Sequence, residues 1–150
     1  MLNVIKVRIY PNKNQQQKIH QTFGSVRLVY NLLLDAKIKA YECGDKLSGY
    51  DLKKRLVPMK NASPDGFLKE VDSTSLQNSI LNLDKAYKNF FRRVKTGGTP
   101  GFPKFKSKNH SKQSYQTSTA MIKKNKLFLP KIGEIRSKFH RNVPLCRLKT

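Results

Sequence analysis

The chain has 150 residues and a mass of 17.3 kDa, which suits one domain of ordinary size. Its 31 Lys and Arg against 9 Asp and Glu give a formal net charge of +22. It contains two cysteines, no signal-peptide pattern and no apolar run of about eighteen residues. We therefore expect no membrane span, no secreted disulfide framework and no zinc finger, and a reducing cytosol as the compartment.

The positive charge is concentrated in the second half of the sequence. Residues 1–84 contain 13 basic and 8 acidic side chains, whereas residues 85–150 contain 18 basic side chains and a single acid, Glu134. Such a surplus repels itself unless a polyanion neutralises it, which favours nucleic acid as the partner. A solvated basic surface is the simpler alternative. An anionic membrane is disfavoured, because the basic half has no amphipathic helix with a clean apolar face.

The first elements expected along the chain are a strand and two helices. Residues 4–10 alternate apolar and polar side chains and predict a strand. Residues 12–23 and 25–41 carry apolar side chains at helical spacing, and Gly24 between them predicts a break. These two helices would form a helix-turn-helix, an arrangement that is as compatible with plain packing as with DNA reading.

The longest expected helix comes after a stretch broken by glycine and proline. Residues 45–71 leave room for one short helix over residues 51–57. A helix over residues 73–94 follows, with Asp72 or Ser73 as its N-cap. Its apolar side chains are four and three residues apart, which predicts lengthwise packing on the preceding helix. They are Leu76, Ile80, Leu83, Tyr87, Phe90 and Val94.

The last third of the chain changes character. Residues 99–108 hold two prolines and a glycine and are expected to be extended. Strands are expected over residues 114–122, 127–129 and 134–139. Because the strand at the N-terminus needs a partner, we predict an α+β fold in which a small antiparallel sheet or barrel is interrupted by a helical insertion.

No catalytic constellation is recognisable in the sequence. Its acids fall mostly at expected helix ends and turns, and its three histidines have no metal-ligand spacing to other side chains. Cys43 and Cys146 lie far apart without a neighbouring base, and Gly97-Gly98 lacks the lysine of a phosphate-binding loop. We therefore expect no cofactor, no metal and no catalysis from this chain.

Binding chemistry is better represented. The cations expected to contact phosphates are Lys88, Arg92, Arg93, Lys95, Lys104, Lys106 and Lys108. Phe102 and Phe105 alternate with the last three lysines, and they either stack on bases or plug the joint between helices and sheet. Residues 115–119 are rich in hydroxyl groups and form either a strand that donates to phosphates and base edges or the wet face of an ordinary sheet.

Four motifs in order carry a resemblance to a known family. They are Gly24-x-x-Arg27-x-x-Tyr30-Asn31, Asp84-x-Ala86-Tyr87-Lys88-Asn89-Phe90-Phe91, Gly101-Phe102-Pro103-Lys104-Phe105-Lys106 and Leu127-x-Leu129-Pro130-Lys131-Ile132-Gly133. The chain resembles the N-terminal third of the TnpB/OrfB proteins of bacterial insertion sequences, which are RNA-guided DNA endonucleases related to type V CRISPR effectors. The resemblance covers roughly residues 4–142.

The resemblance implies a particular division of the chain. Residues 1–11 and 99–150 would form a discontinuous wedge domain, an oligonucleotide-binding-type β-barrel, and residues 12–98 a helical recognition domain. The implied partners are a guide RNA from the transposon end and target DNA, in the bacterial cytoplasm and associated with the nucleoid. The protein would read a short flanking motif, while base pairing reads the rest of the target.

The resemblance also implies site residues. Those that would read the flanking motif are Ser73, Thr74, Gln77, Tyr50, Thr117 and Thr119. Gln77 is the expected base reader, because an amide can pair with adenine through two hydrogen bonds. Ser73 is alternatively only the helix cap. Arg27 and Tyr30 either contact RNA or have a buried structural role. The expected phosphate and RNA contacts are Arg27, Lys88, Arg92, Arg93, Lys104, Phe105, Lys106, Lys108 and Tyr115.

The end of the sequence departs from the family. Family members continue into a RuvC-type nuclease domain with three metal-binding acids and a zinc ribbon, whereas this sequence stops at Thr150 without them. We expect a truncated, non-enzymatic binding module, with any nuclease half supplied by another chain. The alternative is a stand-alone DNA-binding regulator, or a transposase fragment that uses the N-terminal helix pair.

Overall fold

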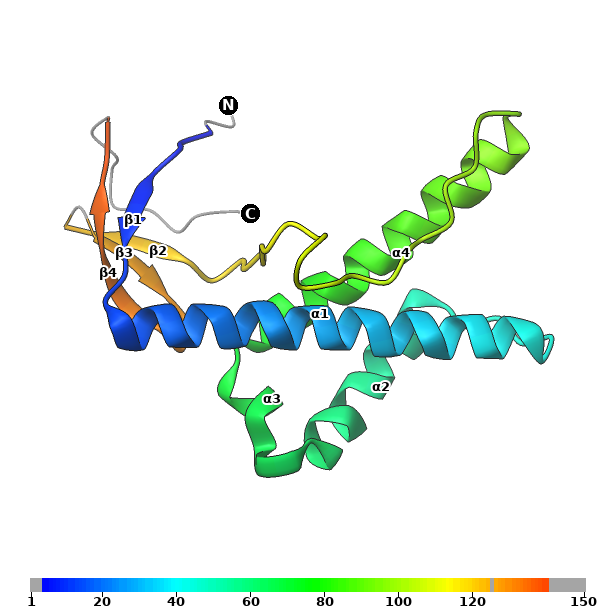
Figure 1. Cartoon of the computed structure of the whole chain (residues 1–150), viewed down its shortest axis with the longest axis horizontal. Coiled ribbons are helices and arrows are strands. Elements are labelled where there is room, and N and C mark those ends of the chain that lie inside the picture. The colour runs from blue at the N-terminus through cyan, green and yellow to red at the C-terminus, as the bar shows by residue number, and fades with distance from the viewer. Residues whose placement is uncertain (1–3, 125, 141–150) are drawn as a thin grey trace.

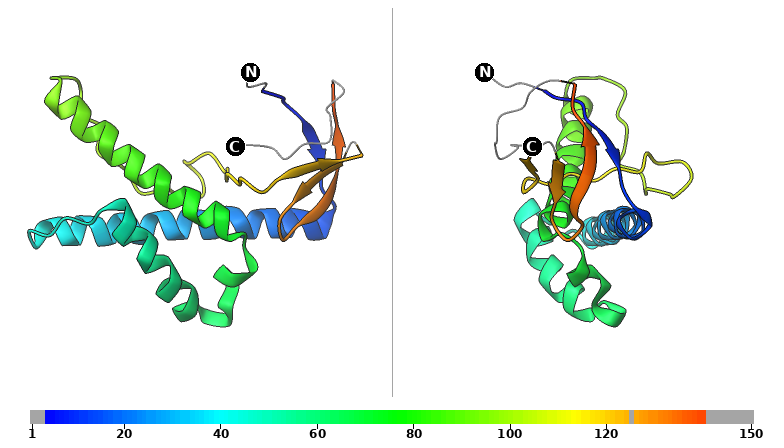
Figure 2. Two further views of the ribbon diagram at one scale, coloured as in Figure 1. Left: turned by 180° about the vertical axis from the view of Figure 1, so that it is seen from behind. Right: turned by 90° about the vertical axis from the view of Figure 1, so that its left-hand side faces the viewer.

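The computed structural model describes residues 4–124 and 126–140 and confirms the α+β class (Figure 1). The elements, in chain order, are β1 (Arg8–Tyr10), α1 (Lys13–Glu42), α2 (Gly49–Ala62), the 3-10 turn η1 (Pro64–Gly66), α3 (Phe67–Glu70), α4 (Ser73–Lys95), β2 (Met121–Lys123), β3 (Lys126–Leu129) and β4 (Gly133–Lys138). The sheet lies over the N-terminal end of α1, and α2 and α3 lie on the other side of that helix (Figure 2).

The sheet joins the two ends of the described chain. Its strand order is β1-β4-β3-β2, with every pair antiparallel and Ile9 opposite Ser137. The prediction that the N-terminal strand pairs with the last strands is thus confirmed. The described strands form an open sheet rather than a closed barrel. Gln15 fastens it to α1, because its side-chain N–H donates to the carbonyl oxygen of Glu134 at 2.7 Å.

Helix α1 overturns the expected break at Gly24. It runs through that glycine as one helix of 30 residues, begun by a capping box between Asn12 and Gln15. Ser25, expected as the cap of a second helix, is only 2% exposed inside α1. A glycine within a helix costs about 1 kcal/mol relative to alanine. The packing of Ile19 before it and of Val26 and Val29 after it outweighs that cost.

Two further elements differ in length from the prediction. Helix α2 is longer than the expected helix over residues 51–57, because Ser48 and Asp51 form a capping box and the helix continues through Pro58. The expected strand over residues 114–122 shortens to β2. Thr117 and the carbonyl oxygen of Gln116 are instead hydrogen-bonded to side chains at the start of α4, so this stretch lies against a helix and not along a strand.

The predicted lengthwise packing of α4 holds for its first half. Leu76, Ile80 and Leu83 are fully buried against α1 and α2. Beyond Tyr87 the two helices diverge (Figure 1), and Val94 at the end of the apolar seam is 51% exposed. A second, smaller core lies under the sheet, and Tyr115 packs against both cores. The molecule is therefore a helical body and a small sheet joined on one long helix.

Candidate nucleic-acid interface

Residues 99–108, here called the strap, follow α4 and run back toward α1 without regular secondary structure (Figure 1). Asn31 holds the strap on α1 with two hydrogen bonds. The backbone N–H of Lys106 donates to Asn31 Oδ1 at 2.8 Å, and Asn31 Nδ2 donates to the carbonyl oxygen of Lys106 at 2.9 Å. An asparagine amide can pair in this way with the backbone N–H and C=O of one residue, as a neighbouring strand would. The first and third family motifs, which contain Asn31 and Lys106, are thus joined directly by hydrogen bonds.

The side chain of Lys106 is turned toward the protein. Its Nζ lies 4.1 Å from the centre of the Tyr30 ring, a cation–π contact. Burial lowers the pKa of Lys106, and no acid pairs with it among the described residues. Lys106 is therefore placed as an anchor of the strap. Its neighbours Lys104 and Lys108 are exposed.

The structure separates the roles of the two phenylalanines of the strap. Phe102 packs edge-on against Tyr87 and Phe90, with ring centroids 5.6 and 5.3 Å apart, and so closes the joint between strap and α4. Phe105 is 55% exposed and makes no ring contact within the described residues. Along the strap it lies between the exposed Lys104 and Lys108, and this arrangement fits stacking on a base.

Of the four cations predicted on α4, Arg93 lies beside the strap, close to Gly101. Lys88, Arg92 and Lys95 line a shallow recess together with Phe91. Lys88 differs, because its Nζ is paired with Asp84 at 2.8 Å. Basic residues also gather at the last turn of α4, where cations are favoured by the helix dipole.

Arg27 lies in a second basic recess, next to the loop that follows the strap. It lines this recess with Lys106 and Lys112, and with Phe23 at the edge. Lys112 is a basic residue that reasoning from the sequence did not single out, since it stands outside the alternation of the strap. Tyr115, expected as an RNA contact, is partly buried against both cores, and its hydroxyl is buried. Burial, followed by the nearby charge of Asp72, raises the pKa of its hydroxyl to about 12.

The residues expected to read a flanking motif, apart from Tyr50, lie at or near the start of α4. Asp72 is the N-cap, accepting from the backbone N–H of Thr74 at 3.2 Å, so of the two predicted caps Asp72 is confirmed and Ser73 is wrong. The hydroxyl of Ser73 instead accepts from Lys60 at 2.6 Å. Thr117 donates to Asp72 Oδ2 at 2.7 Å and lies 3.1 Å from the Thr119 hydroxyl.

Burial raises the pKa of Asp72, but hydrogen bonds from Thr117, Ser75 and Thr74 outweigh it and hold that pKa below its ordinary value. Asp72 was not expected to organise this cluster, because its link to Thr117 spans 45 residues. Gln77 is exposed one turn further along α4. Tyr50 lies elsewhere: its neighbour Gly49 faces Asp84, about 10 Å beyond Gln77 along the helix axis.

Two absences complete the description. Within residues 4–124 and 126–140, no group of three or more His, Cys, Asp or Glu side chains is arranged to hold a metal ion. Over the same residues, no helix is long and apolar enough to cross a membrane.

Comparisons with known proteins identify the family. The model of a helix-turn-helix domain, that of the IS605 OrfB proteins, matches residues 1–46, which here contain β1 and the continuous α1. The chain is 32% identical over 145 residues to "Putative RNA-guided DNA endonuclease InsQ" of Escherichia coli K12, covering 95% of this chain and 35% of that protein. It is also 32% identical to "Putative RNA-guided DNA endonuclease" of Streptomyces pristinaespiralis, covering 86% of this chain and 32% of that protein.

A third relative has a length closer to that of this chain. It is "Virulence protein VsdF" of Salmonella dublin, 36% identical over 118 residues, which are 73% of this chain and 96% of that protein. The chain spans about a third of the length of the two relatives named as endonucleases, and its match to VsdF covers nearly all of VsdF. From the four motifs, the matched domain and these relatives, we conclude that the chain belongs to the TnpB/OrfB family and corresponds to its N-terminal part.

Proposed function

We propose that this chain is a nucleic-acid-binding module of TnpB/OrfB type, which holds guide RNA and target or flanking DNA and does not itself cut. Residues 1–11 and 99–150 would form its wedge part, whose open sheet would be one portion of an oligonucleotide-binding-type barrel. Residues 12–98 would form its helical recognition part. Two relatives named as RNA-guided DNA endonucleases support this assignment. Cleavage would require a nuclease domain contributed by a further part of the system.

The observation that carries the proposal is the fixed strap. An extended segment held to α1 by Asn31 displays Lys104, Phe105 and Lys108 outward, and the basic end of α4 lies near its start. Cations on either side of an exposed aromatic ring fit a groove that follows a nucleic-acid strand. Because the strap is already held in this conformation, binding would not carry the entropic cost of ordering it.

The double variant Lys104→Ala, Lys108→Ala tests this interface. Each phosphate contact contributes about 0.7 to 0.9 to the slope of log K against log salt, so the slope should become shallower by about 1.4 to 1.8. Binding to RNA and to duplex DNA would be measured by fluorescence anisotropy over a salt series. Lys53→Ala, Lys69→Ala on α2 and α3 is the matched control with the same change in charge. Equal slopes for the two double variants would contradict the interface.

Gln77→Ala tests the proposed reading of a flanking motif. Gln77 is exposed one turn above the cluster of Asp72 and Thr117, so its amide is free to reach a base edge. We expect a loss of about 1–3 kcal/mol in binding to duplexes that carry the correct motif, and little change for other sequences. Duplexes with a randomised flanking sequence would be selected for binding to each protein and sequenced. The enrichment of each sequence then gives the change in binding for the correct motif and for all others. An equal loss on every sequence would make Gln77 a structural residue.

Guide RNA binding needs its own experiment. RNA that co-purifies with the chain, from cells that express the adjoining transposon-end RNA, should be enriched in that RNA over bulk RNA. The matched helix-turn-helix domain favours a second candidate function, a stand-alone DNA-binding regulator. That function predicts saturable binding to one duplex without any RNA. A gel shift with RNase-treated protein therefore separates the two functions.

A further inference from the structure

The fourth family motif, residues 127–133, ends β3 and forms the turn that leads into β4. The backbone N–H of Ile132 donates to the carbonyl oxygen of Leu129 at 3.2 Å. This bond closes a four-residue turn with Pro130 in its second position and Lys131 in its third. Lys131 has a φ of +66°, in the left-handed region. A turn with a positive φ at its third position is of type II and normally carries glycine or asparagine there.

The turn carries a lysine where its backbone favours glycine. A side chain that persists in a sparsely populated conformation points to a role for that side chain. Lys131 is exposed, and it lines a recess of about 370 Å³ together with Lys18 of α1. Glu70 and Val71, which directly precede the N-cap of α4, line the same recess. The turn therefore lies close to the segment that leads from α3 into α4 (Figure 2).

A second lysine reaches the start of α4 from α2. The Nζ of Lys60 donates to the hydroxyl of Ser73, the first residue of α4, at 2.6 Å. Burial lowers the pKa of Lys60, the charge of Asp72 opposes this effect, and the charge of Lys131 adds to it. The two lysines are thus near enough to repel each other. Among the described residues, neither of them lies within ion-pair distance of an acid.

The two acids in this region accept hydrogen bonds from uncharged groups. Glu70 Oε2 accepts from the side-chain N–H of Gln21 at 2.7 Å. Asp72 accepts from the first turn of α4 and from Thr117. Two cations that repel each other beside the N-terminus of a long helix favour an anion between them, because the partial positive charge of the helix end adds to their own.

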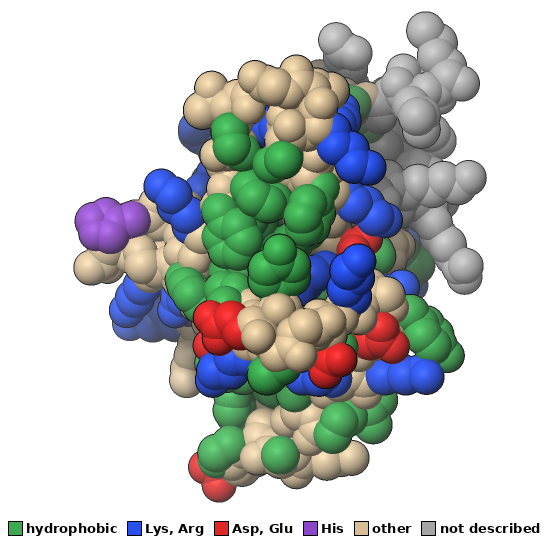
Figure 3. Space-filling view, turned by 90° about the vertical axis from the view of Figure 1, so that its right-hand side faces the viewer, with side chains coloured by type: hydrophobic (Ala, Val, Ile, Leu, Met, Phe, Trp, Pro, Cys, Tyr) green, Lys and Arg blue, Asp and Glu red, His purple; other side chains and the backbone are tan. Residues whose placement is uncertain are grey.

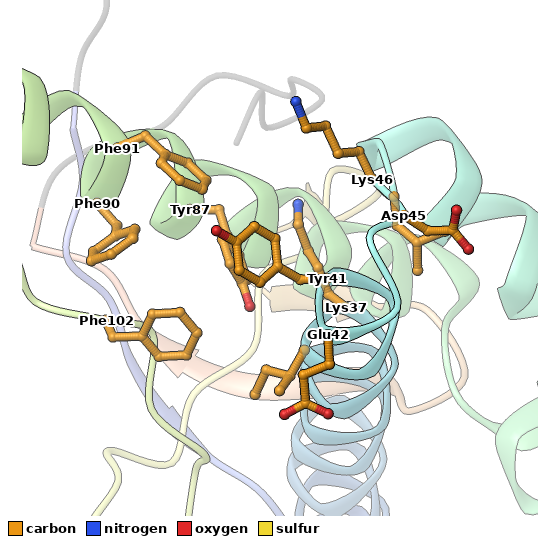
Figure 4. A pocket seen from close by; sticks show the side chains of 11 residues that line it. Lys37, Tyr41, Glu42, Asp45, Lys46, Tyr87, Phe90, Phe91 and Phe102 are labelled. Carbon is orange, nitrogen blue, oxygen red and sulfur yellow. The ribbon is translucent and has the colours of Figure 1, made fainter.

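The aromatic pocket toward the other end of α1 is built differently. It has a volume of about 650 Å³, and Phe90 and Phe102 face Tyr41 across it (Figure 4). Lys37 on its rim is already engaged, with its Nζ 4.0 Å from Asp84 Oδ1. Figure 3 looks onto this end of the molecule and shows apolar side chains at the centre with acidic groups below them. This pocket suits an apolar group, whereas the lysines near the start of α4 suit phosphate.

We propose that Lys131 and Lys60 bind phosphates of the flanking DNA duplex and so position it for the residues at the start of α4. The assignment rests on the proposed function, in which the exposed Gln77, one turn along α4, reads a base of that duplex. Phosphate contacts fix the register of a duplex without reading its sequence. The sheet thus takes part in DNA recognition through a single turn.

Lys131→Gly tests this assignment, because glycine fits the left-handed backbone and removes only the side chain. The midpoint of urea unfolding should not fall, since glycine adopts a positive φ without strain. Binding to a duplex that carries the flanking motif should nevertheless weaken. Over a salt series followed by fluorescence anisotropy, the slope of log K against log salt should become shallower by about 0.9, which is the share of one phosphate and corresponds to a loss of affinity of roughly five- to tenfold at about 0.1 M NaCl. Lys60→Gln, which keeps a donor for Ser73, should have a similar effect.

Lys124→Gly is the matched control. Lys124 has a φ of +41° in the turn between β2 and β3, at the opposite end of β3, so the same change removes one charge and relieves the same kind of backbone strain. It should leave the slope unchanged. Equal slopes for the two glycine variants would overturn this assignment and leave the proposed function intact, as would a loss of affinity confined to RNA. A natural chain that binds no duplex would contradict the proposed function, and the assignment with it.

Discussion

Replacing Asn31 by leucine should release the strap from α1. Leucine fills nearly the same space but cannot pair with the backbone N–H and C=O of Lys106, so a partly buried N–H and a carbonyl oxygen lose their partners. Each unpaired group costs about 1–3 kcal/mol when it stays buried. The chain avoids that cost by letting the strap detach, and we therefore expect local opening of residues 99–108 rather than global unfolding.

Limited trypsin digestion detects this opening, because Lys104, Lys106 and Lys108 lie in the strap. Cleavage there should be faster in Asn31→Leu by at least about tenfold, which corresponds to 1.4 kcal/mol of lost protection. Affinity for RNA should fall similarly, because binding now has to order the strap. Asn78→Leu is the matched control, since Asn78 makes a single hydrogen bond, to the carbonyl oxygen of Gln116 at 3.1 Å. Unchanged cleavage of the strap in Asn31→Leu would contradict its role as the anchor.

Local patterns in the sequence were sufficient for helix α4. The apolar spacing of α4 predicted its length and, over its first half, its burial and its packing on α1, since one face of a helix repeats its contacts every turn. The pattern failed at Gly24, where a local preference for a break competes with the long-range packing of Val26 and Val29. A propensity of about 1 kcal/mol is a weak signal beside such burial.

The organisation of the binding surface could not be obtained from the sequence. Asn31 and Lys106 are 75 residues apart, and Asp72 and Thr117 are 45 apart. A hydrogen bond between such positions leaves no periodic trace in the chain. The alternation of cations and phenylalanines in the strap was visible, but the assignment of Phe102 to packing and Phe105 to the surface depends on where α4 lies. The sequence identifies the candidate binding side chains, and the tertiary contacts determine which of them are exposed to a ligand.

Asp72→Ala should have the largest effect on stability among the residues near the proposed flanking-DNA site. Its carboxylate accepts from the backbone N–H of Thr74, the hydroxyl of Ser75 at 3.0 Å and the hydroxyl of Thr117 at 2.7 Å. Loss of the N-cap and of two hydrogen bonds to a charged group should lower the free energy of unfolding by about 3 kcal/mol. Urea denaturation measures the change. Asp51→Ala, which removes a capping-box acid on α2, should cost no more than about 1 kcal/mol.

The pH dependence gives a second test of Asp72. Its pKa in the folded protein lies below the ordinary value of 3.8, so the stabilisation by its charge is present in full above that value and is lost as the pH falls through the folded pKa. Asp72→Asn keeps a cap oxygen and removes the charge, so its stability should approach that of the natural protein in acid. A difference that stays constant between about pH 6 and pH 3 would show that the charge contributes nothing.

The binding data for the same variants decide why an acid stands beside the proposed DNA-reading residues. A carboxylate repels phosphates, so if Asp72 simply faced the DNA, Asp72→Ala would bind a flanking duplex more tightly. If its role is to hold Thr117 and the first turn of α4, the same change loosens the residues around Gln77 and weakens binding. We expect the second result, with Asp72→Asn closer to the natural protein than Asp72→Ala, because asparagine still caps the helix.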